Sequence, residues 1–142
     1  MAVLMELSRI LIRELNDYQI IELREARADA GPSAAPARAF PIVIGLPEAH
    51  AIERSLKGIS VKRPQTHDLL GSVIRSLGGE LRSVTINALT ESTFFATLDV
   101  LKGGTLIHID SRPSDALALA VGAEVPVYVE ESVLEAAAKD EP

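Results

Sequence analysis

The sequence contains no cysteine and no tryptophan among its 142 residues. The absence of cysteine excludes disulfide bonds and thiolate metal ligands, and it fits a reducing compartment. Aromatic residues make up only 4% of the chain, so the hydrophobic core must be built from aliphatic side chains. Because the N-terminal apolar run is short, includes Glu6 and lacks a cleavage-site pattern, we expect no signal peptide, no transmembrane helix, no membrane association and a cytoplasmic location.

The acidity of the chain is concentrated at its C-terminal end. The formal net charge is −6, but six of the 20 acidic residues and one of the 14 basic residues lie in the last twenty positions, leaving residues 1–122 almost neutral. A polyanionic partner is therefore not excluded. The length indicates one domain, which we place at residues 1–137, followed by an acidic tail at residues 138–142.

Several catalytic motifs are missing. The chain has no glycine-rich dinucleotide fingerprint, P-loop, HExxH motif or GxSxG motif. A kinase, ATPase or dehydrogenase function has no support from the sequence.

The hydrophobic pattern predicts an α+β fold with a mostly antiparallel or mixed sheet and three to four helices packed on it. The segment DAGPSAAPARA, residues 29–39, is predicted as a loop. Strands are predicted at residues 5–13, 18–24, 40–44, 81–89, 93–101, 105–110 and 125–129. Helices are predicted at residues 47–58, 66–77, 114–121 and 132–138, with Ala49, Ile52 and Leu56 as the buried stripe of the first and Leu69, Leu70, Val73, Ile74 and Leu77 as the apolar face of the second.

Four polar residues gather where a strand gives way to an apolar helix: Asp110, Arg112, Ser114 and Asp115. We expect Ser114 to be the N-cap and Asp115 the first helical residue. The cluster has two interpretations at this stage. It is either capping chemistry with a neutralising arginine, or a functional site, because one cap needs only one side chain.

A second polar group, PQTHDLL, starts the helix at residue 66, with Thr66 as the expected N-cap and Asp68 in the first turn. The helix N-terminus disfavours a charged imidazole, so His67 could act as a base or metal ligand. A polar first turn without function is the alternative. His50 and His108 lack neighbouring ligand patterns and are interpreted as structural.

Two further groups of charges lie on or near the first helix. Glu48 and Glu53 are interpreted as solvent-exposed helix charges. Arg54, Lys57, Lys62 and Arg63 form the one local basic patch, which could hold phosphates or could equally be a solvated surface.

The chain resembles the bifunctional nuclease domain family of bacteria and plants, to which RNase and DNase activity is attributed. The resemblance covers roughly residues 5–137 and is carried by PIVIGLPEAHAI at 41–52, RPQTHDLL at 63–70, TFFATL at 93–98 and IDSRPSDALALA at 109–120. It implies an α+β fold, homo-oligomers and phosphodiester hydrolysis of RNA or DNA. The chain departs from the family pattern with Phe95, where tyrosine is common, and with a longer connection at residues 29–39.

The resemblance implies a set of site residues: His67, Asp68, Asp110, Arg112, Ser114 and Asp115, with Glu48 and Thr66 as second choices. From the basic patch, Arg54, Lys62 and Arg63 are predicted as substrate-binding cations. A mechanism follows as a hypothesis. Asp68, Asp110 and Asp115 would bind a divalent metal such as Mg²⁺. His67 would act as general base or acid, and Arg112 would bind a phosphate oxygen.

This hypothesis requires the starts of the second and third helices to meet, with His67 and Asp115 within about 10 Å, the distance over which one ion or phosphate could engage both. The competing hypothesis is a non-catalytic oligomeric regulatory or protein-interaction module. It is favoured because residues 1–122 have almost no net charge and because the few aromatic residues cannot form a surface on which bases of a single strand stack. A small-molecule binder that uses Arg112 as an anion clamp is a third possibility.

Overall fold

The computed structural model describes residues 1–26 and 36–139. Residues 29–35 of the predicted loop and residues 140–142 of the predicted tail lie outside the described residues. Among the described residues, no helix combines the length and apolar character needed to cross a membrane.

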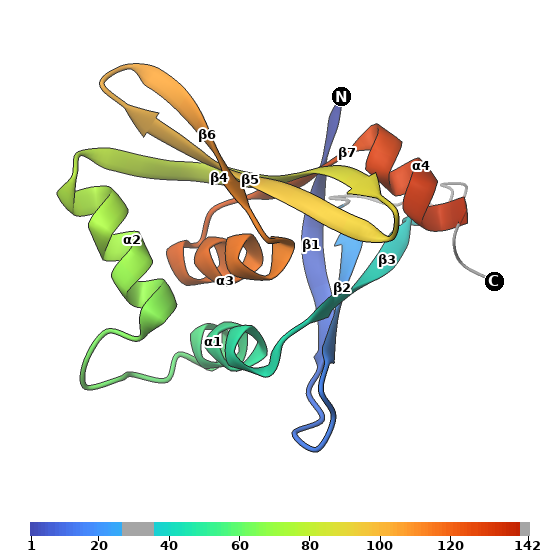
Figure 1. The fold of residues 1–142 in the computed structure, drawn as a ribbon, viewed down its shortest axis with the longest axis horizontal. Helices are drawn as coiled ribbons and strands as arrows, with labels where there is room; N and C mark the ends of the chain where they lie inside the picture. The colour runs from blue at the N-terminus through green and yellow to red at the C-terminus, as the bar shows by residue number, and fades with distance from the viewer. Residues whose placement is uncertain (27–35, 140–142) are drawn as a thin grey trace.

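The described strands form one seven-stranded sheet with the order β3-β2-β1-β7-β4-β5-β6 (Figure 1). Its strands are β1 (Ala2–Leu11), β2 (Gln19–Glu25), β3 (Ala39–Ile44), β4 (Gly79–Thr90), β5 (Thr93–Lys102), β6 (Thr105–Ser111) and β7 (Val127–Glu130). β4 and β7 pair in parallel, and all other neighbours are antiparallel. The prediction of a mixed, mostly antiparallel sheet in an α+β domain is confirmed.

Two tight turns set the register of β4, β5 and β6. Glu91 and Ser92 have φ of 49° and 64°, and Gly103 and Gly104 have φ of 57° and 80°. Positive φ at both central residues is the signature of the two-residue turn whose twist matches that of a β-hairpin. Thr90 therefore pairs with Thr93, and Lys102 pairs with Thr105.

Four helices pack around this sheet: α1 (Leu46–Lys57), α2 (Thr66–Ser76), α3 (Pro113–Ala123) and α4 (Glu131–Lys139). α3 lies against β4 and β5, and α1 packs on the side of α3 away from the sheet (Figure 1). α3 is buried along most of its length, from Ser114 through Ala120, because it is enclosed by the sheet, α1 and α2. This enclosure explains why its sequence is apolar on all sides.

Two predicted helix starts are wrong by one or two residues. Gln65, not Thr66, is the N-cap of α2: the Gln65 side chain accepts from the Asp68 amide and the Asp68 side chain accepts from the Gln65 amide. Arg112, not Ser114, is the N-cap of α3, because Pro113 has a φ suited to the first helical position and no amide hydrogen to lose. Asp115 is consequently in the third helical position and not the first.

The apolar residues of α2 are less buried than the sequence pattern suggests. None of its residues is buried, and Leu69, Val73 and Leu77 are 55%, 43% and 68% exposed. In α1, Ala49 and Ile52 are buried as predicted, but Leu56 is 54% exposed. α2 is therefore attached to the rest of the domain along one side only.

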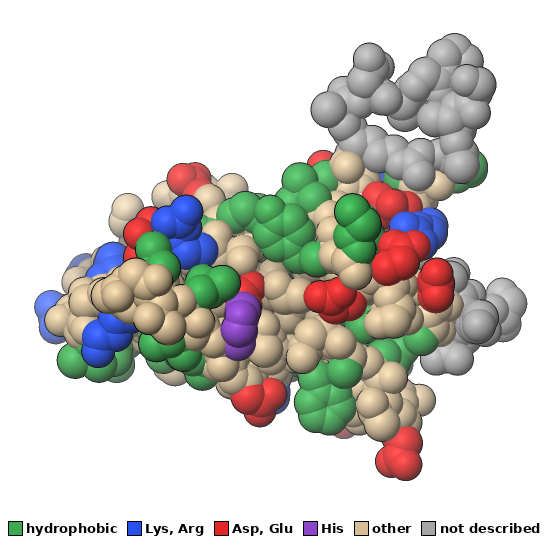
Figure 2. All heavy atoms as spheres, turned by 90° about the horizontal axis from the view of Figure 1, so that it is seen from above, with side chains coloured by type: hydrophobic (Ala, Val, Ile, Leu, Met, Phe, Trp, Pro, Cys, Tyr) green, Lys and Arg blue, Asp and Glu red, His purple; other side chains and the backbone are tan. Residues whose placement is uncertain are grey.

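The face of the sheet turned away from α3 contains a buried carboxylate, Asp99. It accepts hydrogen bonds from the hydroxyls of Ser83, Thr85 and Thr97, and it pairs with Nδ1 of His108 at 2.8 Å. Burial alone would raise the pKa of Asp99, but these four partners outweigh it and the pKa is lowered. Seen from above, most Lys and Arg side chains lie at the left of the view, whereas acidic side chains are spread across this face (Figure 2).

Replacing Asp99→Asn is expected to reduce the free energy of unfolding by about 1–3 kcal/mol at pH 7, because the hydroxyl donors lose a charged acceptor. Asp110→Asn is the control, since Asp110 is exposed and lies on the same face of the sheet as Asp99. Because the pKa of Asp99 is lowered in the folded state, its contribution is present above about pH 4 and is lost as the pH falls further. Urea denaturation at pH 7 and pH 3 measures both effects. Equal stability of both variants at pH 7 would contradict the prediction.

Candidate active site

The first turns of α2 and α3 meet through one hydrogen bond. His67 Nε2 lies 2.9 Å from Oδ1 of Asp115, although the two residues are 48 positions apart in the chain. Their side chains are 15% and 28% exposed, so the pair is sheltered but open to solvent. The structure thus meets the geometric requirement of the nuclease hypothesis that the two helix starts lie together.

Arg112 binds the same carboxylate. Its Nε donates to Asp115 Oδ2 at 2.9 Å, and its Nη2 donates to Oδ1 at 3.2 Å, which makes a two-pronged ion pair. Because Arg112 is the N-cap and Asp115 the third helical residue, the start of α3 itself brings them together. The guanidinium is 68% exposed, and within the described part of the chain Nη1 makes no hydrogen bond.

Glu48 completes the cluster from the first turn of α1. Its Oε1 accepts from Arg112 Nη2 at 2.9 Å and from Ser114 Oγ at 3.5 Å. Glu48 is only 6% exposed, so its interpretation as a solvated helix charge is wrong. The preceding Gly45 leaves room for this carboxylate, because a Cβ there would lie 3.2 Å from both of its oxygens.

The contacts fix the charges of the cluster. Burial raises the pKa of Asp115, but the hydrogen bonds from Arg112 and His67 together lower it below its usual range. The hydrogen bond to Asp115 is also the largest cause of the raised pKa of Arg112. At neutral pH the site therefore holds an ionised Asp115 beside a permanently charged guanidinium.

A hollow opens on each side of the cluster. His67 and Asp68 line a pocket of about 730 Å³ between α1, α2, α3 and the start of β4. Arg112 and Ser114 line a shallower one of about 400 Å³, which is bounded by Tyr18, β3 and the β4–β5 turn. A bound chain could therefore run past Asp115 with a neighbouring unit on either side.

Other predicted site residues lie elsewhere. Asp110 is on β6, where it faces the same side as Thr97 and Asp99, away from α3. Asp68 uses Oδ2 to accept from the Gln65 amide at 3.0 Å, in its capping role. The structure therefore does not bring Asp110 to Asp115.

The predicted metal ligands do not form a common set. Within residues 1–26 and 36–139, no group of three or more His, Cys, Asp or Glu side chains is arranged to hold a metal ion. Both oxygens of Asp115 already have protein partners. We therefore derive no catalytic step through a metal.

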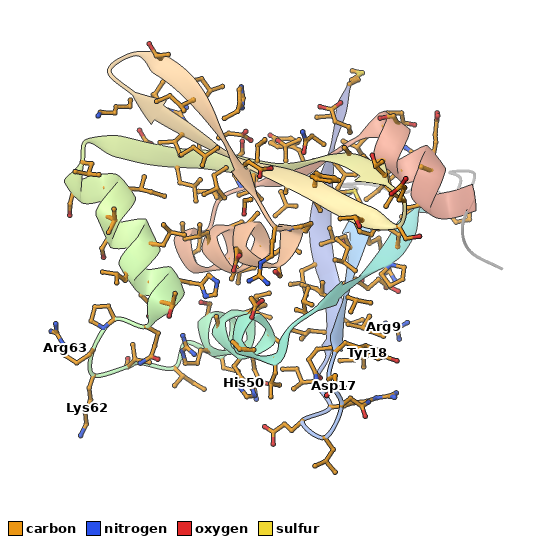
Figure 3. The ribbon with its side chains drawn as sticks, in the orientation of Figure 1. Arg9, Asp17, Tyr18, His50, Lys62 and Arg63 are labelled. Atoms are coloured by element: carbon orange, nitrogen blue, oxygen red, sulfur yellow. The ribbon has the colours of Figure 1, made fainter. Side chains whose placement is uncertain are left out.

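The predicted basic patch is divided. Arg54 lines the larger pocket. Lys62 also lines this pocket, whereas Arg63 does not, and the labelled Arg63 side chain points away from the helices (Figure 3). Lys57 pairs with Glu53 at 3.6 Å across one turn of α1.

Sequence reasoning missed two features of the polar network. The burial of Glu48 depends on a contact with Arg112, 64 positions away, and no local pattern signals it. The Asp99–His108 pair, in contrast, follows from the two-glycine turn, since a hairpin closed by Lys102 and Thr105 places residues 99 and 108 opposite each other.

The chain matches the family profile of the bifunctional nuclease domain over residues 32–142. It therefore belongs to the bifunctional nuclease domain family. Its open His–Asp–Arg cluster is suited to acid–base chemistry on an anionic substrate. It is 39% identical to an uncharacterized protein of Mycobacterium tuberculosis over 125 residues, which cover 88% of this chain and 70% of that relative.

Plant relatives carry the nuclease name at lower identity. The chain is 30% identical over 97 residues to bifunctional nuclease 2 of Oryza sativa subsp. japonica, covering 66% of this chain and 30% of that protein. It is 27% identical over 93 residues to bifunctional nuclease 2 of Arabidopsis thaliana, covering 63% and 28%. The chain thus corresponds to less than a third of these plant proteins.

Replacing Glu48→Ala is expected to lower the free energy of unfolding by about 1–3 kcal/mol, because it empties a buried position and removes one partner of Arg112. Glu53→Ala on the same helix is the matched control, with an expected change within about 0.5 kcal/mol, as is typical of surface ion pairs. Thermal and urea denaturation measure both variants. A loss for Glu48→Ala no larger than for the control would show that the buried contact is not stabilising.

Proposed function

We propose that this protein is a nuclease that hydrolyses phosphodiester bonds of RNA or DNA at the cluster of His67, Asp115, Arg112, Ser114 and Glu48. The observation that carries the proposal is the 2.9 Å contact between His67 and Asp115, which joins two distant helix starts at a solvent-open point beside a guanidinium. Membership in the bifunctional nuclease domain family supports the same reaction class.

His67 is the proposed proton-transfer group. Because Asp115 is ionised, it accepts the hydrogen of His67 Nε2 and fixes the ring, which leaves Nδ1 with a lone pair. Nδ1 makes no hydrogen bond within the described residues. It can take a proton from a water that attacks phosphorus while the P–O bond to the leaving oxygen breaks, and that oxygen takes a proton from solvent. The imidazolium that forms is stabilised by Asp115.

Arg112 is the proposed phosphate-binding group. Nε and Nη2 are held by Asp115 and Glu48, so the free Nη1 projects from a fixed guanidinium. A donor that is already oriented can bind a non-bridging phosphate oxygen and stabilise the charge that develops on it. Glu48 is a positioning residue in this scheme, since it touches Arg112 and Ser114 and is itself buried.

A second candidate function, an oligomeric interaction module, is favoured by the exposed side of α2. Leu69, Val73 and Leu77 follow one another at four-residue spacing along this helix and are all exposed. Such a stripe suits a second copy of the chain. We propose that the protein forms homo-oligomers through this surface, which is compatible with nuclease activity. An interaction module without catalytic activity would leave nucleic acid intact.

His67→Gln is expected to lower the rate of cleavage of single-stranded RNA and DNA by about 10²–10⁴-fold, because the proton-transfer group is lost while the polar surface remains. His50→Gln is the control: His50 is on α1 and pairs with Glu14 at 3.4 Å, apart from the cluster. Rates are measured with end-labelled oligonucleotides, and circular dichroism verifies folding. Equal rates for His67→Gln and the control would remove His67 from the mechanism.

The metal requirement is tested separately. We propose Mg²⁺ as a cofactor that arrives with the substrate, since Mg²⁺ often binds phosphate oxygens with only one or two protein carboxylates. Asp68, at the edge of the larger pocket, is the carboxylate proposed to contact it. Dialysis against EDTA is expected to abolish cleavage and added Mg²⁺ to restore it. Full activity after chelation would contradict the proposed cofactor.

A further inference from the structure

We propose that the 730 Å³ pocket under α2 binds one unpaired nucleotide of a single-stranded nucleic acid, so that the enzyme selects single strands over duplexes. The inference rests on the proposed function only in placing the cleaved phosphate beside His67. Apart from His67, the residues that carry the inference lie outside the His67–Asp115 cluster. They are a glycine at the pocket wall and two arginines.

The pocket has the size and lining of a small-ligand site. Its volume of about 730 Å³ lies within the range of about 300–1,000 Å³ that is usual for such sites. Its apolar surface includes Leu119 and Ala118 of α3, Ile74 of α2 and Val125. Aliphatic walls of this kind can hold the flat face of a nucleobase.

Glycine keeps the α2 wall of the pocket open. Gly71 is in the interior of α2, where glycine is unfavourable relative to alanine. A Cβ built on Gly71 would lie 3.4 Å from Nη1 of Arg75 and 3.9 Å from Cδ2 of Leu119. A guanidinium and an apolar side chain therefore both lie within 4 Å of a position that has no side chain, and together they offer contacts for the anionic and apolar parts of a nucleotide.

The charges of the pocket favour an anion. The pocket is lined by three cations, Arg54, Lys62 and Arg75, and by two carboxylates, Asp68 and Glu80. The two carboxylates have other partners, since Asp68 accepts from the Gln65 amide and Glu80 pairs with Arg82. Neither Arg54 nor Arg75 forms an ion pair with a carboxylate in the described part of the chain. Arg75 makes one hydrogen bond, from Nη2 to the hydroxyl of Ser72 at 3.3 Å. Two guanidinium groups without acidic partners are suited to phosphate oxygens.

The pocket is continuous with the proposed reaction centre. His67 lines the pocket and also contacts Asp115, so a nucleotide in the pocket has its phosphate end near the cluster. A base within a duplex is stacked and paired, and it can enter a pocket only after it is extruded. A strand that is already single avoids this cost, and the pocket therefore predicts single-strand selectivity.

The first experiment measures binding of the four 5′-nucleoside monophosphates to the whole protein by isothermal titration calorimetry. Wild type is expected to bind, Arg75→Ala and Arg54→Ala to bind about tenfold more weakly, and Gly71→Leu not to bind, because the new side chain occupies the pocket. Arg9→Ala is the control for loss of an exposed cation that does not line the pocket. Ser76→Leu is the control for a leucine added at an exposed position of α2.

The second experiment compares cleavage of a single-stranded oligonucleotide with cleavage of the same sequence as a duplex. Wild type is expected to prefer the single strand by at least tenfold, and Gly71→Leu is expected to lose that preference together with its rate. Gly71→Ala keeps the fold and tests the position with a side chain too small to fill the pocket, so it is expected to retain most of the activity.

The outcomes separate the two proposals. If wild type cleaves but Gly71→Leu binds nucleotides and cleaves as wild type does, the pocket inference fails and the nuclease proposal stands. If wild type binds nucleotides and Gly71→Leu does not, while neither cleaves, the pocket inference stands and the nuclease proposal fails. The pocket inference is overturned if wild type does not bind nucleotides or binds only an apolar peptide. It is also overturned if wild type cleaves the duplex as fast as the single strand.

Discussion

The carboxylate of Asp115 is the point on which the functional half of this molecule depends. It binds His67 of α2 with one oxygen and Arg112 with both, and Arg112 in turn reaches Glu48 of α1. Three helices are thereby joined at their first turns, where the N-terminal ends of their dipoles favour negative charge. The two carboxylates offset these dipoles, and the guanidinium between them reduces the repulsion between the buried Glu48 and the partly buried Asp115.

Much of the fold was predictable because its signals are local. The strands predicted at residues 81–89, 93–101 and 105–110 are present as consecutive antiparallel strands, because the tight turns at Glu91–Ser92 and Gly103–Gly104 connect them directly. The N-caps of α2 and α3 were misplaced because Thr66 and Ser114 are good capping residues in isolation, whereas Gln65 with Asp68, and Arg112 before Pro113, give better starts in their context. Local propensity identifies a helix start to within one or two residues, and the neighbours decide which residue it is.

The candidate site was predictable in part. The family resemblance indicated both His67 and Asp115 as site residues, but their meeting could not be predicted, since nothing in a single sequence fixes the distance between residues so far apart. Asp110 was grouped with Asp115 because they are close in sequence, but a strand alternates its side chains between faces, and Asp110 is directed to the side of Asp99. Glu48 was assigned to solvent because a glutamate in a first turn is usually exposed, and its burial is caused by tertiary contacts alone.

The incomplete burial of α2 has a consequence for how the domain comes apart. Since no residue of α2 is buried while α3 is enclosed on most sides, releasing α2 exposes little apolar surface, and the sheet with α3 can persist without it. Detachment of this one helix would separate His67 from Asp115 while the remaining domain stays folded. The His67–Asp115 cluster and the scaffold thus have different free energies of opening, so the domain can lose this cluster through a subglobal fluctuation well before it denatures.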